Sequence, residues 1–482
     1  MSDFRPVFYV IGLMTGAVGG MMLIPAFIDF VYRDTSWPAF LVSGVVVGLL
    51  GATLSVGSYT PRPRLSSKGA FLLTALSWVF LSAVSAIPFM MQPLGLGFTD
   101  AMFEATSGIT TTGSTVLTGL DDLPKGVLMW RAILQWIGGI GIIVTALAFL
   151  PMLKVGGMQL FRLESSDVGE KVLPRAASIA TAIGTIYLVL TLACASAYML
   201  TGMNGFDAVA HAMTTVATGG YSTSDNSMGN FMEGGADVVC VLFMVLGAMP
   251  FGVYLLMAQR KFRRSLLDPQ VRAFLVIITT FSLTVAGLYW AAGEVAFLRA
   301  FRLSAFNTVS IITGTGYATT DYQLWGPFAV AFFFAFMFIG GCAGSTACSI
   351  KVFRYQVAAE AMRSYLFRMP RQHAIKPIRY GGQVLPEGVV YSVMGYFFLF
   401  FLAFAVTAML LSLLGLDPLT AWSGAGSAIA NVGPGLGEII GPAGTYEPLS
   451  NTAKWVLLLA MIVGRLEIVT ALVVLSPSFW RH

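Results

Sequence analysis

The sequence predicts an all-α membrane protein in which ten transmembrane helices form an N-terminal two-helix hairpin plus four helix–re-entrant pore loop–helix repeats around one central pore. Three observations predict this fold class. The chain of 482 residues is 56% hydrophobic and 11% charged, whereas soluble domains have about 25% charged residues. Ten apolar stretches approach the length of about 20 residues that crosses a bilayer. A short polar segment of small residues recurs four times between these stretches.

The ten expected membrane crossings define the organisation of the chain. They lie near 8–31, 38–59, 69–92, 127–152, 175–201, 236–260, 271–293, 324–350, 385–415 and 452–477. One polar segment separates each of the last four pairs of crossings. Because internal repetition of this kind defines structural units, the expected units are a hairpin at 1–68 and pore repeats at 69–174, 175–268, 269–380 and 381–482.

Basic residues indicate the orientation of the chain in the membrane. Most of the 28 Lys and Arg residues lie in four loops, at 62–68, 154–175, 260–272 and 351–379. Lys and Arg near crossing ends are retained in the cytoplasm, so both termini are expected there and the polar segments should open outward. None of these loops interleaves aromatic residues for base stacking, so the net charge of +5 does not indicate a nucleic-acid partner.

The loop at 351–379 is the longest of the four basic loops, and it is expected to form a helix that ends before Pro370. A basic cytoplasmic helix can contact the anionic headgroups of the lipid bilayer. It can also be the docking surface for a soluble partner. The sequence does not separate these two interpretations.

The four polar segments occupy 104–113, 210–219, 305–314 and 424–433 when they are aligned without gaps. Each ends in a β-branched residue followed by glycine, at Gly113, Gly219, Gly314 and Gly433. One such pair is most simply a helix-packing glycine, but four copies in equivalent places favour a shared function. Non-helical backbone survives at membrane depth only when it is buried in protein or lines a water-filled cavity. The segments are therefore expected to surround one pore.

The expected chemistry of this pore is cation selection by backbone carbonyl groups. A short half-helix at 103–108 or 306–310 would enter from outside and point its partially negative C-terminal end inward. Rings of carbonyl oxygens can replace the hydration shell of an ion, and 431–435 is similar to the Thr-Val-Gly-Tyr-Gly signature of potassium channels. The candidate ion-binding residues are Thr111, Thr112, Gly113, Thr218, Gly219, Gly220, Thr313, Gly314, Thr315, Asn431, Val432 and Gly433.

A gate is expected on the inner side of this filter, in an intramembrane loop at 340–349. The run of small residues at 339–350 cannot form a stiff helix, and its candidate gating residues are Gly340, Gly341, Gly344, Ser345 and Thr346. The alternative is close helix packing through small residues. A loop with free backbone groups would need the wet cavity that the four repeats create.

Charged and polar side chains inside the expected crossings are functional candidates. Arg465 is expected to face the pore and contact carbonyl groups of the 340–349 loop, although a snorkelling arginine is the alternative. Glu467 lies on another helix face and is a poor partner for Arg465 within one helix. Arg131 is expected to support the first re-entrant loop, and His211 to be a buried hydrogen-bonding residue. The four cysteines are expected to be buried thiols.

These segments, the Gly-rich span around 136–141 and the break at 340–349 together resemble the Trk/Ktr/HKT superfamily of potassium transporters, and the N-terminal hairpin makes the chain most similar to the TrkH branch. The resemblance implies a multi-pass protein of the bacterial inner membrane that forms a homodimer with one pore per protomer. It implies K⁺ as the transported ion, with no organic cofactor in this chain. It also implies a cytosolic RCK-type nucleotide-binding subunit, similar to TrkA, that gates the pore.

The expected function is therefore potassium uptake through a carbonyl-lined filter. A sodium- or proton-coupled potassium symporter of the same fold is the main alternative. An unrelated solute carrier would show inverted repeats and a midplane site instead. An enzyme is the least favoured class, because the sequence has no HExxH motif, no phosphate-binding Gly-Lys-Ser/Thr loop and no cluster of His and carboxylates within the crossings.

Overall fold

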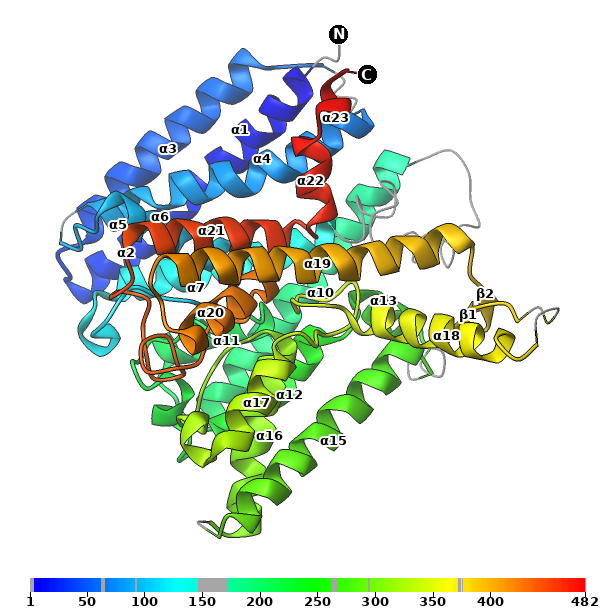
Figure 1. The fold of residues 1–482 in the computed structure, drawn as a ribbon. Coiled ribbons are helices and arrows are strands. Elements are labelled where there is room, and N and C mark those ends of the chain that lie inside the picture. The colour runs from blue at the N-terminus through cyan, green and yellow to red at the C-terminus, as the bar shows by residue number, and fades with distance from the viewer. Residues whose placement is uncertain are drawn as a thin grey trace.

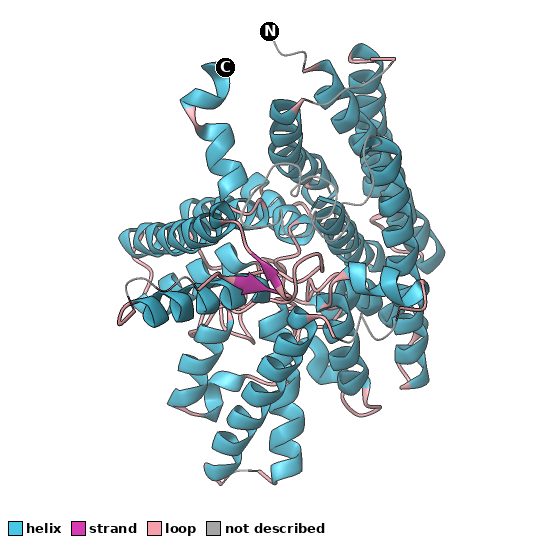
Figure 2. Cartoon of the chain, turned by 90° about the vertical axis from the view of Figure 1, so that its right-hand side faces the viewer, coloured by secondary structure: helices cyan, strands magenta, loops and turns pink. Residues whose placement is uncertain are grey.

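The computed structural model describes residues 4–61, 66–91, 93–145, 172–261, 267–293, 295–371, 374 and 376–481. Helices make up almost all of the regular structure in this part of the chain, and they surround a central region where several loops converge (Figures 1 and 2). One short antiparallel hairpin pairs β1 (Arg379–Tyr380) with β2 (Gln383–Val384). The predicted all-α membrane class is confirmed at this coarse level.

The N-terminal hairpin contains α1 (Arg5–Met21), α2 (Leu23–Tyr32) and α3 (Trp37–Gly57). Glycines bring α1 and α3 into close contact, because a Cβ added to Gly19 would lie 2.6 Å from the backbone nitrogen of Gly48. Helices in a membrane associate through such small residues. Asp29 of α2 fixes the hairpin to the following unit, because its carboxylate accepts hydrogen bonds from Ser36 and from the backbone N–H of Gly126.

The remaining helices follow in four groups. The first group is α4 (Ser67–Ser85), α5 (Ile87–Met90), α6 (Phe98–Ile109), η1 (Leu120–Asp122) and α7 (Lys125–Val144). The second is α10 (Val172–Leu200), α11 (Gly205–Val216), η3 (Ser227–Phe231), α12 (Ala236–Ala248) and α13 (Phe251–Ala258). The third is α15 (Pro269–Ala291), α16 (Phe297–Thr313), η4 (Tyr322–Trp325), α17 (Pro327–Phe336) and α18 (Val352–Arg368). The fourth is α19 (Glu387–Leu413), α20 (Pro418–Ala430), α21 (Asn451–Arg465), α22 (Val469–Leu475) and α23 (Pro477–Arg481).

Three of the predicted crossings differ from continuous helices in the described residues, and a fourth is described only in part. Seven helices are long and apolar enough to cross a membrane, and two bent pairs raise the number to nine. The predicted crossing at 236–260 bends by 89° between α12 and α13, and the one at 452–477 bends by 107° between α21 and α22. The crossing at 324–350 contains only the ten residues of α17 and then becomes irregular. In the crossing at 127–152, α7 is described to Val144 and the rest lies outside the described residues.

The breaks have local causes. Pro250 precedes α13 and cannot donate a backbone hydrogen bond to the turn before it. Glu467 and Ile468 have φ angles of 60° and 45°, in a region that ends a right-handed helix. Hydrophobic length alone does not reveal such breaks, because apolar stretches continue on both sides of them.

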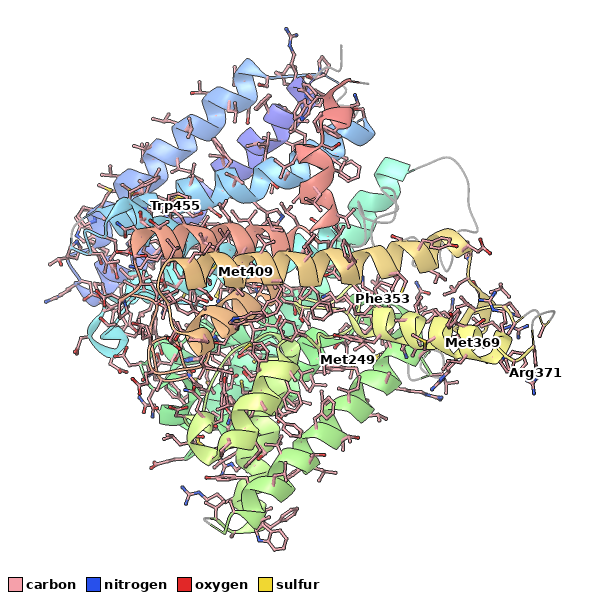
Figure 3. The ribbon with its side chains drawn as sticks, in the orientation of Figure 1. Met249, Phe353, Met369, Arg371, Met409 and Trp455 are labelled. Carbon is pink, nitrogen blue, oxygen red and sulfur yellow. The ribbon has the colours of Figure 1, made fainter. Side chains whose placement is uncertain are left out.

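The surface of the protein carries many large apolar side chains, and part of its interior is polar. Leu200, Leu413 and Val56 are 89%, 81% and 78% exposed, which is expected for side chains that face lipid. The half-helix α6 is instead buried at every position from Ala101 to Ile109, including its glutamate, threonine and serine. Outward-facing apolar side chains such as Met409 on α19 surround this polar interior (Figure 3).

The half-helices α6, α11 and α16 each contact a helix of an adjacent group, and α20 packs against α19 and α21 of its own group. α7 of the first group contacts α11 of the second, α12 contacts α16 of the third, and α21 of the fourth contacts α6 of the first. Asp417 caps α20 by accepting a hydrogen bond from the N–H of Thr420 at 3.0 Å. The hydrogen bonds from Thr420 lower the pKa of Asp417, so this N-cap is fully formed at neutral pH and is lost as the carboxyl becomes protonated.

Candidate functional site: a ring of four filter segments

All four half-helices end in the same backbone motif. The first or second residue after the end of each half-helix adopts a left-handed conformation. The backbone N–H of the residue that follows it donates to the carbonyl five residues before the donor, at 2.8 to 3.0 Å. This is the Schellman motif that ends many helices. A second residue with positive φ, always glycine, follows two positions after the first. The left-handed residues are Thr111, Thr218, Gly314 and Asn431, and the glycines are Gly113, Gly220, Gly316 and Gly433.

This geometry corrects the gap-free alignment of the four segments. The residues equivalent to Gly113 are Gly220 and Gly316, rather than Gly219 and Gly314. The alignment was wrong by one position in the second segment and by two in the third. The alignment matched each β-branched residue that precedes a glycine. The left-handed residue that ends each half-helix is instead a threonine, a glycine or an asparagine, depending on the segment. Gly316 was therefore left out of the candidate ion-binding residues, although its backbone is equivalent to that of Gly113.

The four segments close into a ring. A Cβ added to Gly113, Gly220, Gly316 or Gly433 would lie closer than 3.0 Å to a carbonyl oxygen of the next segment, a distance that real Cβ atoms essentially never show. The carbonyl oxygens met in this way belong, in the same order, to Gly219, Thr315, Val432 and Thr112. The contacts thus run from the first segment to the second, third and fourth, and back to the first. Glycine is required at these positions both by its positive φ and by the close approach.

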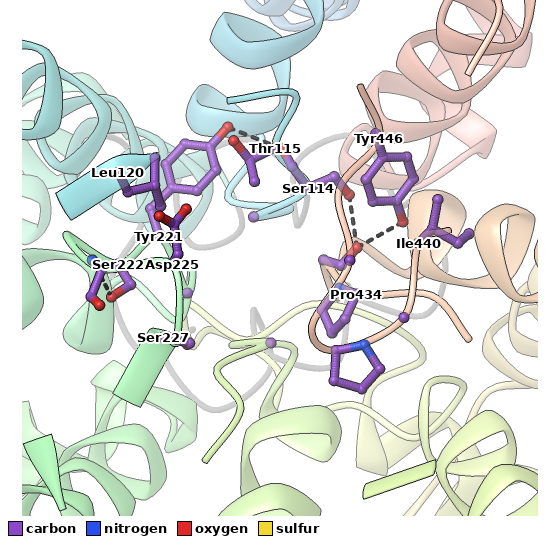
Figure 4. Close-up of a pocket in the computed structure, with 18 of the residues that line it drawn as sticks. Ser114, Thr115, Leu120, Tyr221, Ser222, Asp225, Ser227, Pro434, Ile440 and Tyr446 are labelled. Atoms are coloured by element: carbon purple, nitrogen blue, oxygen red, sulfur yellow. Dashed lines mark hydrogen bonds between the residues drawn. The ribbon is translucent and has the colours of Figure 1, made fainter. Parts of the chain in front are cut away.

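One cavity opens above the ring and touches all four of these glycines. Figure 4 shows Ser114, Tyr221, Pro434 and Tyr446 around it. The hydroxyl groups of Ser114 and Tyr446 each donate a hydrogen bond of 2.8 Å to the carbonyl of Gly433. The cavity is therefore a polar vestibule that ends at the ring of four segments.

A buried ion pair supports the first two segments. Arg131 of α7 donates from Nε to Glu104 of α6 at 2.7 Å, and both side chains are almost fully buried. The same guanidinium donates to the carbonyl of Ser222 at 2.9 Å and to the hydroxyl of Thr115 at 3.2 Å. Arg131 also lies 4.0 Å from the ring centre of Tyr221. The expectation that Arg131 supports the first re-entrant loop is confirmed, and its contacts extend to the second loop.

Three half-helices use a polar side chain at the equivalent position, seven residues before the left-handed residue. Glu104 accepts from the N–H of Val116 at 3.0 Å, and Asn307 donates to Thr319 at 2.9 Å. His211 contacts the hydroxyl of Ser222 through Nε2 at 3.0 Å and the Asp207 carbonyl through Nδ1 at 2.9 Å. Each side chain hydrogen-bonds to the non-helical residues that follow its own segment of the ring. His211 is thus the buried hydrogen-bonding residue that was predicted.

An irregular loop lies on the other side of the ring from the vestibule. Ile339 and Ile350 pair with each other, so the residues between them leave and return at one place. The predicted gating residues Gly340, Gly341, Gly344, Ser345 and Thr346 all lie in this loop and are all buried. The hydroxyl of Thr346 lies within hydrogen-bonding distance of the Val216 carbonyl, at the end of α11, and of the Gly247 carbonyl in α12.

Cys348 brings the same loop against the first and third segments of the ring. Its Sγ lies 3.5 Å from the hydroxyl of Thr111, and its Cβ would be 3.1 Å from a Cβ added to Gly314. Arg465 reaches this sulfur through Nη1 at 2.6 Å. Arg465 also donates to a carbonyl, but that of Gly138 in α7 at 3.2 Å. The predicted contact of Arg465 with the loop is confirmed, whereas its partner there is a thiol rather than a carbonyl group.

Three further predictions can be compared with the structure. All four cysteines are buried free thiols, as expected. The helix predicted in the basic loop is α18, which ends at Arg368, two residues before Pro370. Glu467 does not pair with Arg465, also as expected, but forms a buried ion pair with Arg354 of α18. Sequence spacing gave no signal for that pair, because its members lie 113 residues apart.

The polar ring inside an apolar helical shell defines a membrane protein that passes ions. The sequence model of the TrkH family, described as cation transport proteins, matches residues 37–481. The chain belongs to this family, whose members are transporters rather than enzymes.

Similar proteins cover the whole chain. The Trk system potassium uptake protein TrkI of Halomonas elongata is 44% identical, over 100% of this chain and 98% of the relative. The Trk system potassium uptake protein TrkH of Escherichia coli K12 is 36% identical, over 99% and 100%. The crystal structure of the potassium transporter TrkH from Vibrio parahaemolyticus superimposes with a TM-score of 0.92 at 36% identity, over 100% of both chains.

Proposed function

We propose that this chain takes up potassium ions through the filter ring. The observation that carries the proposal is the closed ring of contacts between Gly113, Gly220, Gly316 and Gly433 and the carbonyl groups of their neighbours. Such a ring can replace the hydration shell of a monovalent cation. The names of the relatives, which are potassium uptake proteins, support potassium as the ion.

The electrostatics of the ring favour a cation over an anion. The C-terminal ends of four half-helices meet at the ring, and each carries a partial negative charge of about half an electron. The nearby carboxylate of Glu104 is occupied by Arg131, so the ligands for the ion are backbone oxygens. The proposed filter residues are 111–113, 218–220, 314–316 and 431–433.

The loop at 340–349 acts as the gate in this proposal. It is held by Thr346 and Cys348 at the inner ends of the filter segments, where it obstructs the path of an ion that has passed the ring. Arg465 adds a positive charge at the same level. Movement of the loop and of Arg465 together would open the path.

The membrane arrangement follows from the same proposal. Ten crossings result if both bent pairs cross and if α17 completes its crossing through the irregular loop that follows it. A homodimer in the bacterial inner membrane, with both termini in the cytoplasm, and a cytosolic RCK-type subunit similar to TrkA follow from the family resemblance. The end of α18 and the residues just after it, Met369 and Arg371, project away from the other helices (Figure 3), so they are accessible to such a subunit.

Growth complementation tests the proposed function. A bacterial strain without its own potassium uptake systems grows only in medium with high potassium, and expression of this chain should restore growth at low potassium. The matched control is the Gly316→Ala variant, expressed at the same level in the membrane, which should restore growth at low potassium less well than the wild-type chain. Equal growth without the chain and with it would contradict potassium uptake.

A further inference from the structure

One filter segment lacks a side chain that the other three have. The residue after the left-handed position is Thr112, Thr315 or Val432 in three segments, and its β-branched side chain restricts the backbone. The second segment has Gly219 there. Glycine has the greatest backbone freedom of all residues, so this segment needs another constraint to hold its carbonyl in the ring.

The side chain of Gln135, from α7, fills the vacant space. A Cβ added to Gly219 would meet the Cγ and the amide group of Gln135 at less than 3.0 Å. Gln135 donates from Nε2 to the carbonyl of Gly219 at 2.6 Å and accepts from the N–H of Tyr221 at 3.0 Å. The Tyr221 N–H can only donate, so it fixes the orientation of the amide. One buried amide therefore bridges the two residues on either side of Gly220.

The Gly219 carbonyl oxygen is also the atom that a Cβ added to Gly113 would meet in the neighbouring segment. A carbonyl oxygen has two lone pairs, so it can accept the hydrogen bond from Gln135 and still face an ion. Within the described residues, the corresponding carbonyls of Thr112, Thr315 and Val432 accept no hydrogen bond. The ring therefore consists of three carbonyls held by stiff residues and one held by a side chain from another helix.

We infer that Gln135 is a specificity-determining residue of the filter, which holds the Gly219 carbonyl at the radius that suits a potassium ion. This inference rests on the proposed function. Without the tether, the flexible Gly219 backbone can follow a smaller ion inward, so sodium is disfavoured less. Gln135 does not contact the ion itself; it positions the Gly219 carbonyl, which does.

The test is the ratio of rubidium to sodium uptake by purified protein in liposomes, because this ratio does not depend on the amount of active protein. Gln135→Leu keeps most of the side-chain volume and removes both hydrogen bonds, so we expect the ratio to fall by about tenfold or more. The matched control is Gln323→Leu, because Gln323 also accepts from and donates to backbone, at Gly437. The control should keep the wild-type ratio.

A paired substitution supplies a second, independent readout. Gly219→Thr alone should abolish uptake, since its side chain collides with Gln135, whereas Gln135→Ala combined with Gly219→Thr should recover uptake and a potassium-like ratio. This pair decides the question if Gln135→Leu gives no measurable uptake. An unchanged ratio in Gln135→Leu, or a double variant no better than Gly219→Thr, would overturn the inference. A wild-type protein that does not prefer rubidium would instead refute the proposed function.

Discussion

Substitution of Gly316 by alanine tests the geometry of the ring directly. Gly316 has a φ of 81°, and an added Cβ would lie 2.8 Å from Cδ of Pro434 and closer still to the carbonyl oxygen of Val432. Ordinary contact begins at 3.4 Å, so Pro434 has to move by about 0.6 Å and the carbonyl by more. The left-handed backbone adds a cost of about 1–2 kcal/mol for an L-residue. We expect the rubidium-to-sodium uptake ratio to fall at least about tenfold, which corresponds to about 1.4 kcal/mol.

Gly119→Ala is the matched control for this experiment. Gly119 has a φ of 67°, but nothing lies within 4 Å of its added Cβ. The control therefore carries the same backbone strain without the collision, and it should lose some thermal stability while it keeps the wild-type ratio. Liposome uptake and thermal unfolding of both variants separate the two effects. A wild-type ratio in Gly316→Ala would refute the assignment of this glycine to the ring.

Three further predictions concern the filter, its support and the gate. Gly113→Ser should lower the rubidium-to-sodium ratio, measured in the same liposomes, because its side chain would meet the Gly219 carbonyl. Arg131→Met leaves the carboxylate of Glu104 buried and unpaired, so folded protein should lose about 3–5 kcal/mol of stability; thermal unfolding measures this, and Glu104→Gln in the same chain should recover part of it. Thr346→Val removes the hydroxyl that bonds the 340–349 loop to α11 and α12. One hydrogen bond contributes about 1 kcal/mol, so its loss should destabilise the closed position of the loop and raise basal rubidium uptake severalfold. Lower uptake by folded Thr346→Val would favour a packing role for the loop.

The sequence predicted the membrane class and the four polar segments because both depend on local composition. Long apolar stretches have few alternatives to a membrane helix. The register within the segments depends instead on where each helix stops, and Thr218 and Gly314 satisfy the same backbone motif with different side chains. Local sequence patterns therefore located the four segments of the proposed filter but misaligned two of them.

The residues that sequence reasoning missed act across long separations. Gln135 lies 84 residues from the carbonyl that it contacts. Arg354 is one of several basic residues in the 351–379 loop, and only the structure shows that it pairs with Glu467. The only local sign that another side chain is needed at this place is the glycine at position 219, where the other three segments have a β-branched residue. It becomes visible only after the four segments are aligned by their backbone conformation.

Uptake of rubidium and sodium by the purified wild-type chain in liposomes tests the central claim most directly. With equal external concentrations and no other ion gradient, a carbonyl ring of this kind should pass rubidium down its gradient and strongly exclude sodium, and external potassium should compete with rubidium. Equal uptake of the two ions would contradict a potassium filter. Rubidium uptake that requires a sodium or proton gradient would contradict passive passage through the ring.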